Sequence, residues 1–257
     1  MADNKIKIVT SVAPLDAFAK TIGGEMVEAH SIVPPSYSHE SFEPKLKDLN
    51  KIADCELLII IGHNSLLFEK KIVEFNKEYS KNNTSNILDL SSLFTDSNED
   101  PHFWSSPIRV LEIAKAIKNQ LLKLSPKNNE LFENNFKQFS LEISNLDQKI
   151  KNELSNKSQK TFISYHPSWY YLAKDYQLTQ IAIENQGKEP SLAFLSKLIT
   201  EAKQKNIHSL VYEPYAPKNS IKLLTEQAKL NSIEIDPSAT DWQNNMQNLI
   251  NFLSKNL

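Results

Sequence analysis

Short apolar runs alternate with amphipathic stretches in the first and last thirds of the chain. The runs are rich in Ile, Val and Leu and end in turn residues, which is typical of buried parallel strands. They predict strands over residues 6–12, 27–33, 56–61, 86–90, 161–165, 178–183, 209–212 and 232–235. The amphipathic stretches predict helices over residues 14–22, 44–53, 66–78, 191–205 and 218–230. Strands that alternate with helices indicate βαβ units, so we expect an α/β fold with parallel sheets.

One long helix is predicted between these two halves. Ser125 and Pro126 have the chemistry of an N-cap and a first helical residue, and no Gly or Pro follows before Pro167. Apolar side chains then recur at spacings of three and four residues, on one helix face: Phe132, Phe136, Phe139, Ile143, Leu146, Ile150 and Leu154. A helix over residues 126–155 would be about 45 Å long, enough to run the length of a two-domain molecule. An exposed coiled-coil arm for dimerisation is the alternative interpretation of the same spacing.

The composition excludes several kinds of partner and site. With 29 Lys and Arg against 31 Asp and Glu, the 257-residue chain has a net charge of −2, and Arg109 is its only arginine. We therefore expect no nucleic-acid partner. Cys55 is the only cysteine, which rules out an internal disulfide or a Cys-x-x-Cys metal site. No apolar run approaches the ~20 residues of a membrane span. The start of the chain carries no apolar signal region, which fits either a cytoplasmic protein or one whose targeting segment has been removed.

Four side chains that can bind a metal follow predicted strands. His39 and His102 lie in the loops after two strands of the first half, and His166 and Asp236 immediately follow two strands of the second half. In open parallel sheets, ligands bind outside the carboxyl ends of the strands, so four groups from two facing domains can converge on one point in a cleft. Three imidazoles and one carboxylate are ligands for a first-row transition metal. The alternative is that these loop histidines are solvated or hydrogen-bonded without any metal.

The remaining histidines and one glutamate have other expected roles. His30 lies inside a predicted strand and His208 just before one, so we expect both to be structural. His63 follows a strand on the same carboxyl edge, where it can be an alternative ligand, a hydrogen-bond donor to a ligand, or a helix-start residue. Glu213 ends a strand of the second half. It either orients a ligand histidine or is a buried, hydrogen-bonded carboxylate.

Three histidine-centred segments carry a family resemblance. They are residues 32–44 around His39, residues 100–107 (Asp-Pro-His-Phe-Trp-Ser-Ser-Pro) and residues 165–169 (Tyr-His-Pro-Ser-Trp), in this order. Over nearly its whole length, the chain resembles the zinc/manganese-binding solute-binding proteins of bacterial and archaeal ABC importers. Members devoted to zinc often carry a long histidine-rich loop before the second histidine, whereas residues 91–99 here are short and contain no histidine.

This resemblance implies a fold and a ligand set. The fold consists of two Rossmann-like parallel-sheet domains, at residues 1–124 and 157–257, joined by one long helix at residues 125–156, with a metal site in the interdomain cleft. By the same resemblance, the metal ligands are His39, His102, His166 and Asp236.

The expected function is capture and delivery of a metal ion. We expect the chain to bind Zn²⁺, with Mn²⁺ as the alternative, outside the cytoplasmic membrane and to deliver it to the permease of the importer. Three imidazoles favour zinc, and a closed shell of four protein ligands suits capture rather than catalysis. We expect a monomer with no enzymatic activity, lipid-anchored in the full-length precursor. Two alternatives use the same residues: a metal-dependent hydrolase with Asp236 or Glu213 as general base, or a binding module for a chelated metal or small organic ligand.

Overall fold

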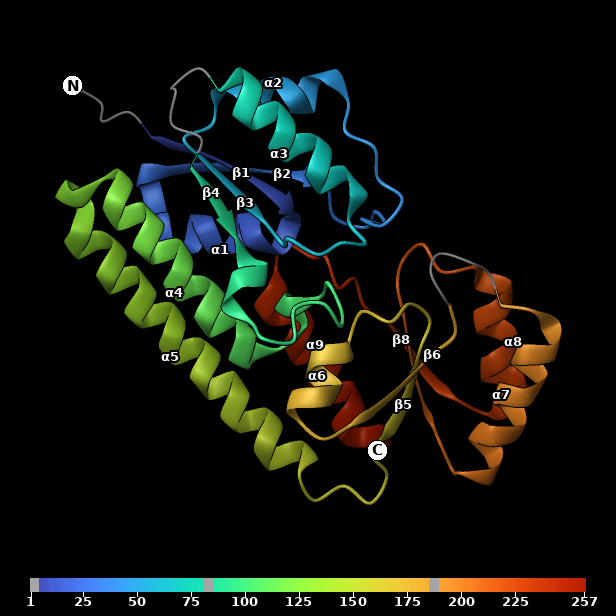
Figure 1. Cartoon of the computed structure of the whole chain (residues 1–257). Helices are drawn as coiled ribbons and strands as arrows, with labels where there is room; N and C mark the ends of the chain where they lie inside the picture. The colour runs from blue at the N-terminus through green and yellow to red at the C-terminus, as the bar shows by residue number, and fades with distance from the viewer. Residues whose placement is uncertain (1–4, 81–85, 185–189) are drawn as a thin grey trace. The chain divides into compact units, whose positions relative to one another are not determined.

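The chain folds into two compact units, each built on its own sheet. A computed structural model describes residues 5–80, 86–184 and 190–257 (Figure 1). Unit 1 comprises Met1–Ser144 and Ser238–Asp241, and unit 2 comprises Asn145–Pro237 and Trp242–Leu257. Each unit contains a four-stranded sheet in which every strand pair is parallel. The predicted α/β class with two parallel sheets is therefore confirmed.

The sheet of unit 1 has the strand order β2-β1-β3-β4. Its strands are β1 (Ile6–Val12), β2 (Val27–Val33), β3 (Leu57–Ile60) and β4 (Ile87–Asp89). Its helices are α1 (Ala13–Gly23), α2 (Leu46–Asp54), α3 (Leu67–Tyr79) and α4 (Pro107–Leu124). The helices α2 and α3 cover one face of the sheet, and α1 and α4 cover the other (Figure 1). All four residues of β3 are consequently buried, as expected for an apolar run in the middle of a covered parallel sheet.

The sheet of unit 2 repeats this order as β6-β5-β7-β8. Its strands are β5 (Thr161–Ser164), β6 (Thr179–Ala182), β7 (Ser209–Tyr212) and β8 (Asn231–Glu234). Its helices are α6 (Tyr170–Asp175), α7 (Leu192–Gln204), α8 (Lys218–Ala228) and α9 (Trp242–Asn256). In both sheets the order in which strands are added along the sheet reverses between two neighbouring strands, β1 and β3 in unit 1 and β5 and β7 in unit 2. The carboxyl ends of such strand pairs are where open α/β sheets place functional groups.

The long predicted helix is present as α5 (Asn129–Leu154), which follows a 3₁₀ turn at Pro126–Asn128. Its first part belongs to unit 1 and its last part to unit 2. Six of its seven predicted apolar positions are buried, and Phe136 is half-buried. In unit 1, Phe139 meets Phe18 of α1 with ring centroids 5.7 Å apart. Because the chain itself covers this apolar face, the face is not available for the coiled-coil alternative.

Several details differ from the expected elements. The helix α2 begins at Leu46 rather than at Pro44, because the Asp48 carboxylate accepts the backbone N–H of Lys45 at 2.9 Å and so caps the helix at that residue. The helices α4, α6 and α9 were not predicted. No helix in the described ranges combines the length and the apolar character that a membrane span requires.

Candidate metal centre

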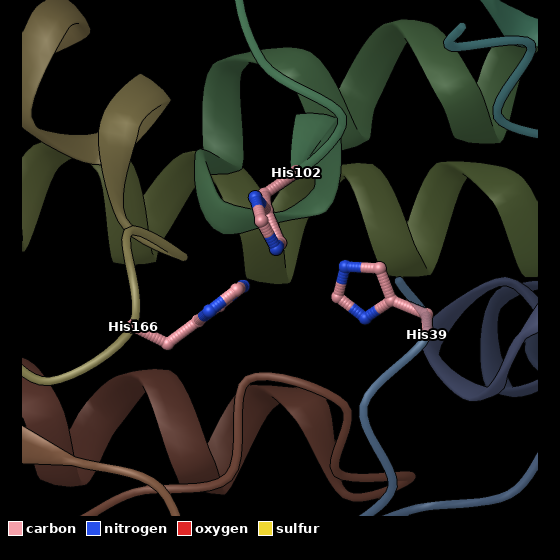
Figure 2. A group of neighbouring side chains, drawn as sticks. All are labelled: His39, His102 and His166. Carbon is pink, nitrogen blue, oxygen red and sulfur yellow. The ribbon is translucent and has the colours of Figure 1, made fainter. Parts of the chain in front are cut away.

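Two histidines of unit 1 lie beside each other. His39 lies in the loop between β2 and α2, and His102 lies between β4 and α4. Both are buried, and one ring nitrogen of each lies within 4.8 Å of the other. Their rings meet edge to face with centroids 4.8 Å apart (Figure 2). Because β2 and β4 are the two edge strands of the sheet, the loops that carry these residues reach toward each other along its carboxyl edge.

Asp100 sets the protonation of the His102 ring. Its Oδ1 accepts the backbone N–H of His102 at 2.8 Å and lies 2.7 Å from ring Nδ1. A carboxylate oxygen at that distance places the ring proton on Nδ1, so Nε2 carries the lone pair. This is the arrangement of a carboxylate–histidine–metal triad, in which the carboxylate fixes the ring and raises the basicity of the ligand nitrogen.

A buried tryptophan packs against both histidines. The buried Trp104 ring lies with its centroid 5.6 Å from that of His39 and 5.3 Å from that of His102. Phe103, the neighbour of His102, is fully buried. Buried aromatic side chains exclude water and lower the local dielectric, so interactions with a bound cation become stronger.

His166 of unit 2 follows β5 and is held through its backbone by Glu213. The His166 N–H donates to Oε2 of Glu213 at 3.2 Å, and the Ser168 hydroxyl donates to Oε1 at 3.4 Å. Glu213 follows β7, the neighbour of β5, so these contacts form beside the strand pair at which the strand order of the sheet reverses. Burial raises the pKa of Glu213 to about 7, and the His166 charge and backbone N–H oppose the rise. Glu213 is thus a buried, hydrogen-bonded carboxylate that positions the backbone of His166 rather than its ring.

The ring of His166, which Figure 2 shows, lies beside the carboxylate of Glu184. Its Nδ1 lies 3.3 Å from Oε2 of Glu184, which follows β6, the other neighbour of β5. A carboxylate beside Nδ1 favours Nε2 as the atom that binds a metal. Sequence reasoning missed both Glu184 and Asp100 as partners of the histidines.

Asp236, the fourth predicted ligand, follows β8 and is half-buried. Its backbone carbonyl accepts Nδ2 of Asn245 at 2.7 Å. A metal-binding group needs at least three His, Cys, Asp or Glu side chains whose ligand atoms lie close together. Among the described residues, the Asp236 carboxylate belongs to no such group in which all ligand atoms lie within 4.8 Å of one another. Its assignment as a ligand stays a prediction.

His63 ties two loops of unit 1 together. Its Nδ1 accepts the backbone N–H of Ser65 at 3.1 Å, which places the ring proton on Nε2, 3.3 Å from the carbonyl oxygen of Asn98. Asn98 lies in the loop that leads to His102. The ring of His63 thus spans the turn after β3 and the loop after β4, a structural role that differs from the three roles predicted for it.

The family described as "Zinc-uptake complex component A periplasmic" matches residues 8–257. The chain belongs to this family. The resemblance carried by the three histidine-centred segments is thereby confirmed.

This chain is similar to two named zinc proteins. The high-affinity zinc uptake system protein ZnuA of Bacillus subtilis (strain 168) is 29% identical over 233 residues, which cover 83% of this chain and 72% of that protein. The zinc-binding lipoprotein AdcA of Streptococcus pneumoniae (strain ATCC BAA-255 / R6) is 27% identical over 276 residues. That match covers 100% of this chain but 55% of AdcA, so the chain spans about half the length of that relative.

A solved structure has a similar fold. The crystal structure described as "138-173 ZnuA deletion mutant plus zinc bound" is similar with a TM-score of 0.87 and 31% identity, over 98% of this chain and 97% of that one. The fold of this chain, with two parallel sheets and one long helix, is therefore similar to that of the solved ZnuA structure.

Proposed function

We propose that this chain captures a zinc ion outside the cytoplasmic membrane and delivers it to the permease of an ABC importer. One observation carries the proposal. In a chain of the zinc-uptake component A family, two buried imidazoles, His39 and His102, lie edge to face, and Asp100 holds the proton of one of them on Nδ1. Buried imidazoles oriented by carboxylates are typical of metal-binding histidines, whereas solvated loop histidines need no such partners.

We assign the ligands as His39, His102, His166 and Asp236. Three nitrogen ligands and one carboxylate oxygen fit zinc, which takes four ligands of these types in a tetrahedron. Asp100 and Glu184 lie beside Nδ1 of two of these histidines. The negative charges of Asp100 and Glu184 favour the binding of a dication at Nε2 of His102 and His166. Manganese, which prefers oxygen ligands, is the weaker candidate.

The location and the partner follow from what the relatives are named. One relative is named a zinc uptake system protein and another a zinc-binding lipoprotein, and the matching family is described as periplasmic. We infer that this chain acts outside the cytoplasmic membrane, with a lipid anchor on the full-length precursor, and hands its zinc to a membrane permease. In this role zinc is cargo, and the chain performs no reaction on it.

Metal titration tests the proposal. Apo-protein is prepared with a chelator, and Zn²⁺ and Mn²⁺ are titrated against a competing chromophoric chelator. The titration is repeated for alanine variants of the four assigned ligands: His39→Ala, His102→Ala, His166→Ala and Asp236→Ala. His208→Ala is the matched control, because it removes an exposed histidine outside the assigned site.

We expect one equivalent of tightly bound Zn²⁺ in the wild type and in His208→Ala, and loss of tight binding in each ligand variant. Wild-type affinity in Asp236→Ala would remove that residue from the ligand set. A wild type without tight zinc binding, or histidine variants that bind as the wild type does, would refute the proposed function.

A further inference from the structure

Arg109, the only arginine of the chain, makes a two-pronged ion pair at the start of α4. Its Nη1 donates to Oδ1 of Asp96 and its Nη2 to Oδ2, each at 2.8 Å. The side chains are 10% and 18% exposed, so solvent screens the pair little. A planar guanidinium on both carboxylate oxygens fixes direction as well as distance, which a lysine ammonium cannot do.

A series of ring contacts continues from Arg109 toward His102. The guanidinium carbon of Arg109 lies 5.1 Å from the centroid of the Phe94 ring, and that ring lies 4.9 Å from the Phe103 ring. Phe103 is fully buried and directly follows His102. A cation over a ring face is attracted by the ring quadrupole, most strongly when both groups are desolvated. Arg109 is thus linked to His102 by packed side chains as well as by the chain.

The Asp96 ion pair acts on the loop that carries His102. Residues 94–101 form turns and bends without a helix or strand, so side-chain anchors decide where this loop lies. Asp96 is an anchor in its middle. Asp100, near its end, holds both the backbone N–H and Nδ1 of His102. A shift of the loop would therefore displace the carboxylate that orients the ring.

We propose that Arg109 is a positioning residue for the captured zinc ion. Its ion pair with Asp96 and its contact with Phe94 hold the loop in place, so His102 is oriented before the metal arrives. This inference rests on the proposed function. A ligand that is already ordered loses less conformational entropy on binding, and most affinity differences of this kind appear in the dissociation rate.

Lys118 provides a matched control on the same helix. Its ammonium donates to both oxygens of Glu133 at 2.9 and 3.0 Å and lies 4.8 Å from the centroid of the Phe136 ring. The kinds of contact are those of Arg109, a carboxylate and a phenyl ring. The partners of Lys118, however, lie on α5 rather than on a loop that carries a proposed ligand. Lys118→Met therefore removes a similar interaction without touching residues 94–101.

The test compares wild type, Arg109→Met, Arg109→Lys and Lys118→Met. Zn²⁺ affinity is measured by chelator competition, Zn²⁺ release by stopped-flow, and ligand geometry by the visible absorption of bound Co²⁺. Urea unfolding of each metal-free protein gives its stability. We expect both Arg109 variants to bind zinc about tenfold more weakly, with faster release and an altered Co²⁺ spectrum, as for other residues that orient a metal ligand. Lys118→Met should lose stability but keep wild-type affinity and spectrum. Arg109→Lys retains the positive charge and remains informative if Arg109→Met fails to fold.

Two outcomes overturn the inference while the proposed function stands. One is wild-type zinc affinity and an unchanged Co²⁺ spectrum in Arg109→Lys. The other is an equal loss of affinity in Lys118→Met, which would mean that zinc binding follows overall stability. A wild type that binds zinc no better than His102→Ala overturns the proposed function itself, and the inference with it.

Discussion

The buried carboxyl of Glu69 should make the stability of unit 1 depend on pH. Glu69 lies on α3, is 3% exposed, and accepts the backbone N–H groups of Ile61 and Gly62, each at 2.8 Å. Burial raises the pKa of Glu69 from 4.5 to about 7, although the two backbone donors oppose the rise. The nearby charge of Asp89 raises it further. A charged Glu69 is thus less favourable in the folded protein than in the unfolded chain.

The size and sign of the effect follow from the two pKa values. Between 4.5 and about 7 the folded protein keeps a proton that the unfolded chain has lost, so the free energy of unfolding falls as the pH rises through this window. Each unit of pKa difference corresponds to about 1.4 kcal/mol. The full loss is therefore about 3 kcal/mol, most of which falls between about pH 5 and about pH 8.

Urea unfolding of the metal-free wild type and of Glu69→Gln measures this loss. Glutamine does not ionise, so the wild type should lose about 2–3 kcal/mol relative to Glu69→Gln between about pH 5 and about pH 8. All other titrating groups are shared by the two proteins and cancel in the difference. Glu74→Gln, at an exposed glutamate of the same helix, controls for the loss of one charge. Parallel pH profiles of the wild type and Glu69→Gln would refute the reasoning, as would an equal change in Glu74→Gln.

Three further predictions concern single residues of unit 1. Asp100→Asn keeps the shape of the side chain beside His102 but removes its charge, so the zinc affinity measured by chelator competition should fall about tenfold. An unchanged affinity would contradict the carboxylate–histidine–metal triad. Phe132→Ala removes a fully buried ring of α5 and should lower the free energy of unfolding in urea by about 3–5 kcal/mol. A loss below about 1 kcal/mol would mean that the ring is not packed as described. Gly62 has φ +80°, and a Cβ there would lie 1.9 Å from Oδ1 of Asp89. Gly62→Ala should therefore lower the thermal midpoint by several degrees, a loss of about 1–3 kcal/mol, and wild-type melting would disprove the strain.

The strands and the histidines beside them were predictable because both depend on local pattern. Apolar runs of four to seven residues became the strands of both sheets, and a parallel sheet leaves the residues after each strand at one edge. That rule selected His39, His102 and His166, all of which are buried. The helix α4 also had a local signal, which was overlooked. Pro107 stands at its first position, and its buried residues recur at helical spacing: Val110, Ile113, Ala114, Ile117 and Leu121.

The carboxylates beside the histidines were harder to predict, because some of them depend on which strands become neighbours in the sheet. Strand pairing of this kind has no signal in the local sequence pattern. Glu184 lies beside the His166 ring only because β6 pairs with β5. The Asp96 ion pair joins a loop to a helix 13 residues later, through two side chains whose directions no periodicity sets. Asp100 stands two residues before His102, a spacing that could have suggested the contact.

Each sheet is built from one continuous segment of the chain, and this has a consequence for how the protein is synthesised. All four strands of the first sheet lie within the first 89 residues, whereas β5 begins only at residue 161. During synthesis the first sheet can therefore pair completely before any strand of the second exists. Each strand of the second sheet likewise finds its neighbours within its own segment. Short separations between pairing strands keep the entropy of loop closure low, and they spare the nascent chain from holding apolar strands exposed while distant partners are still being added.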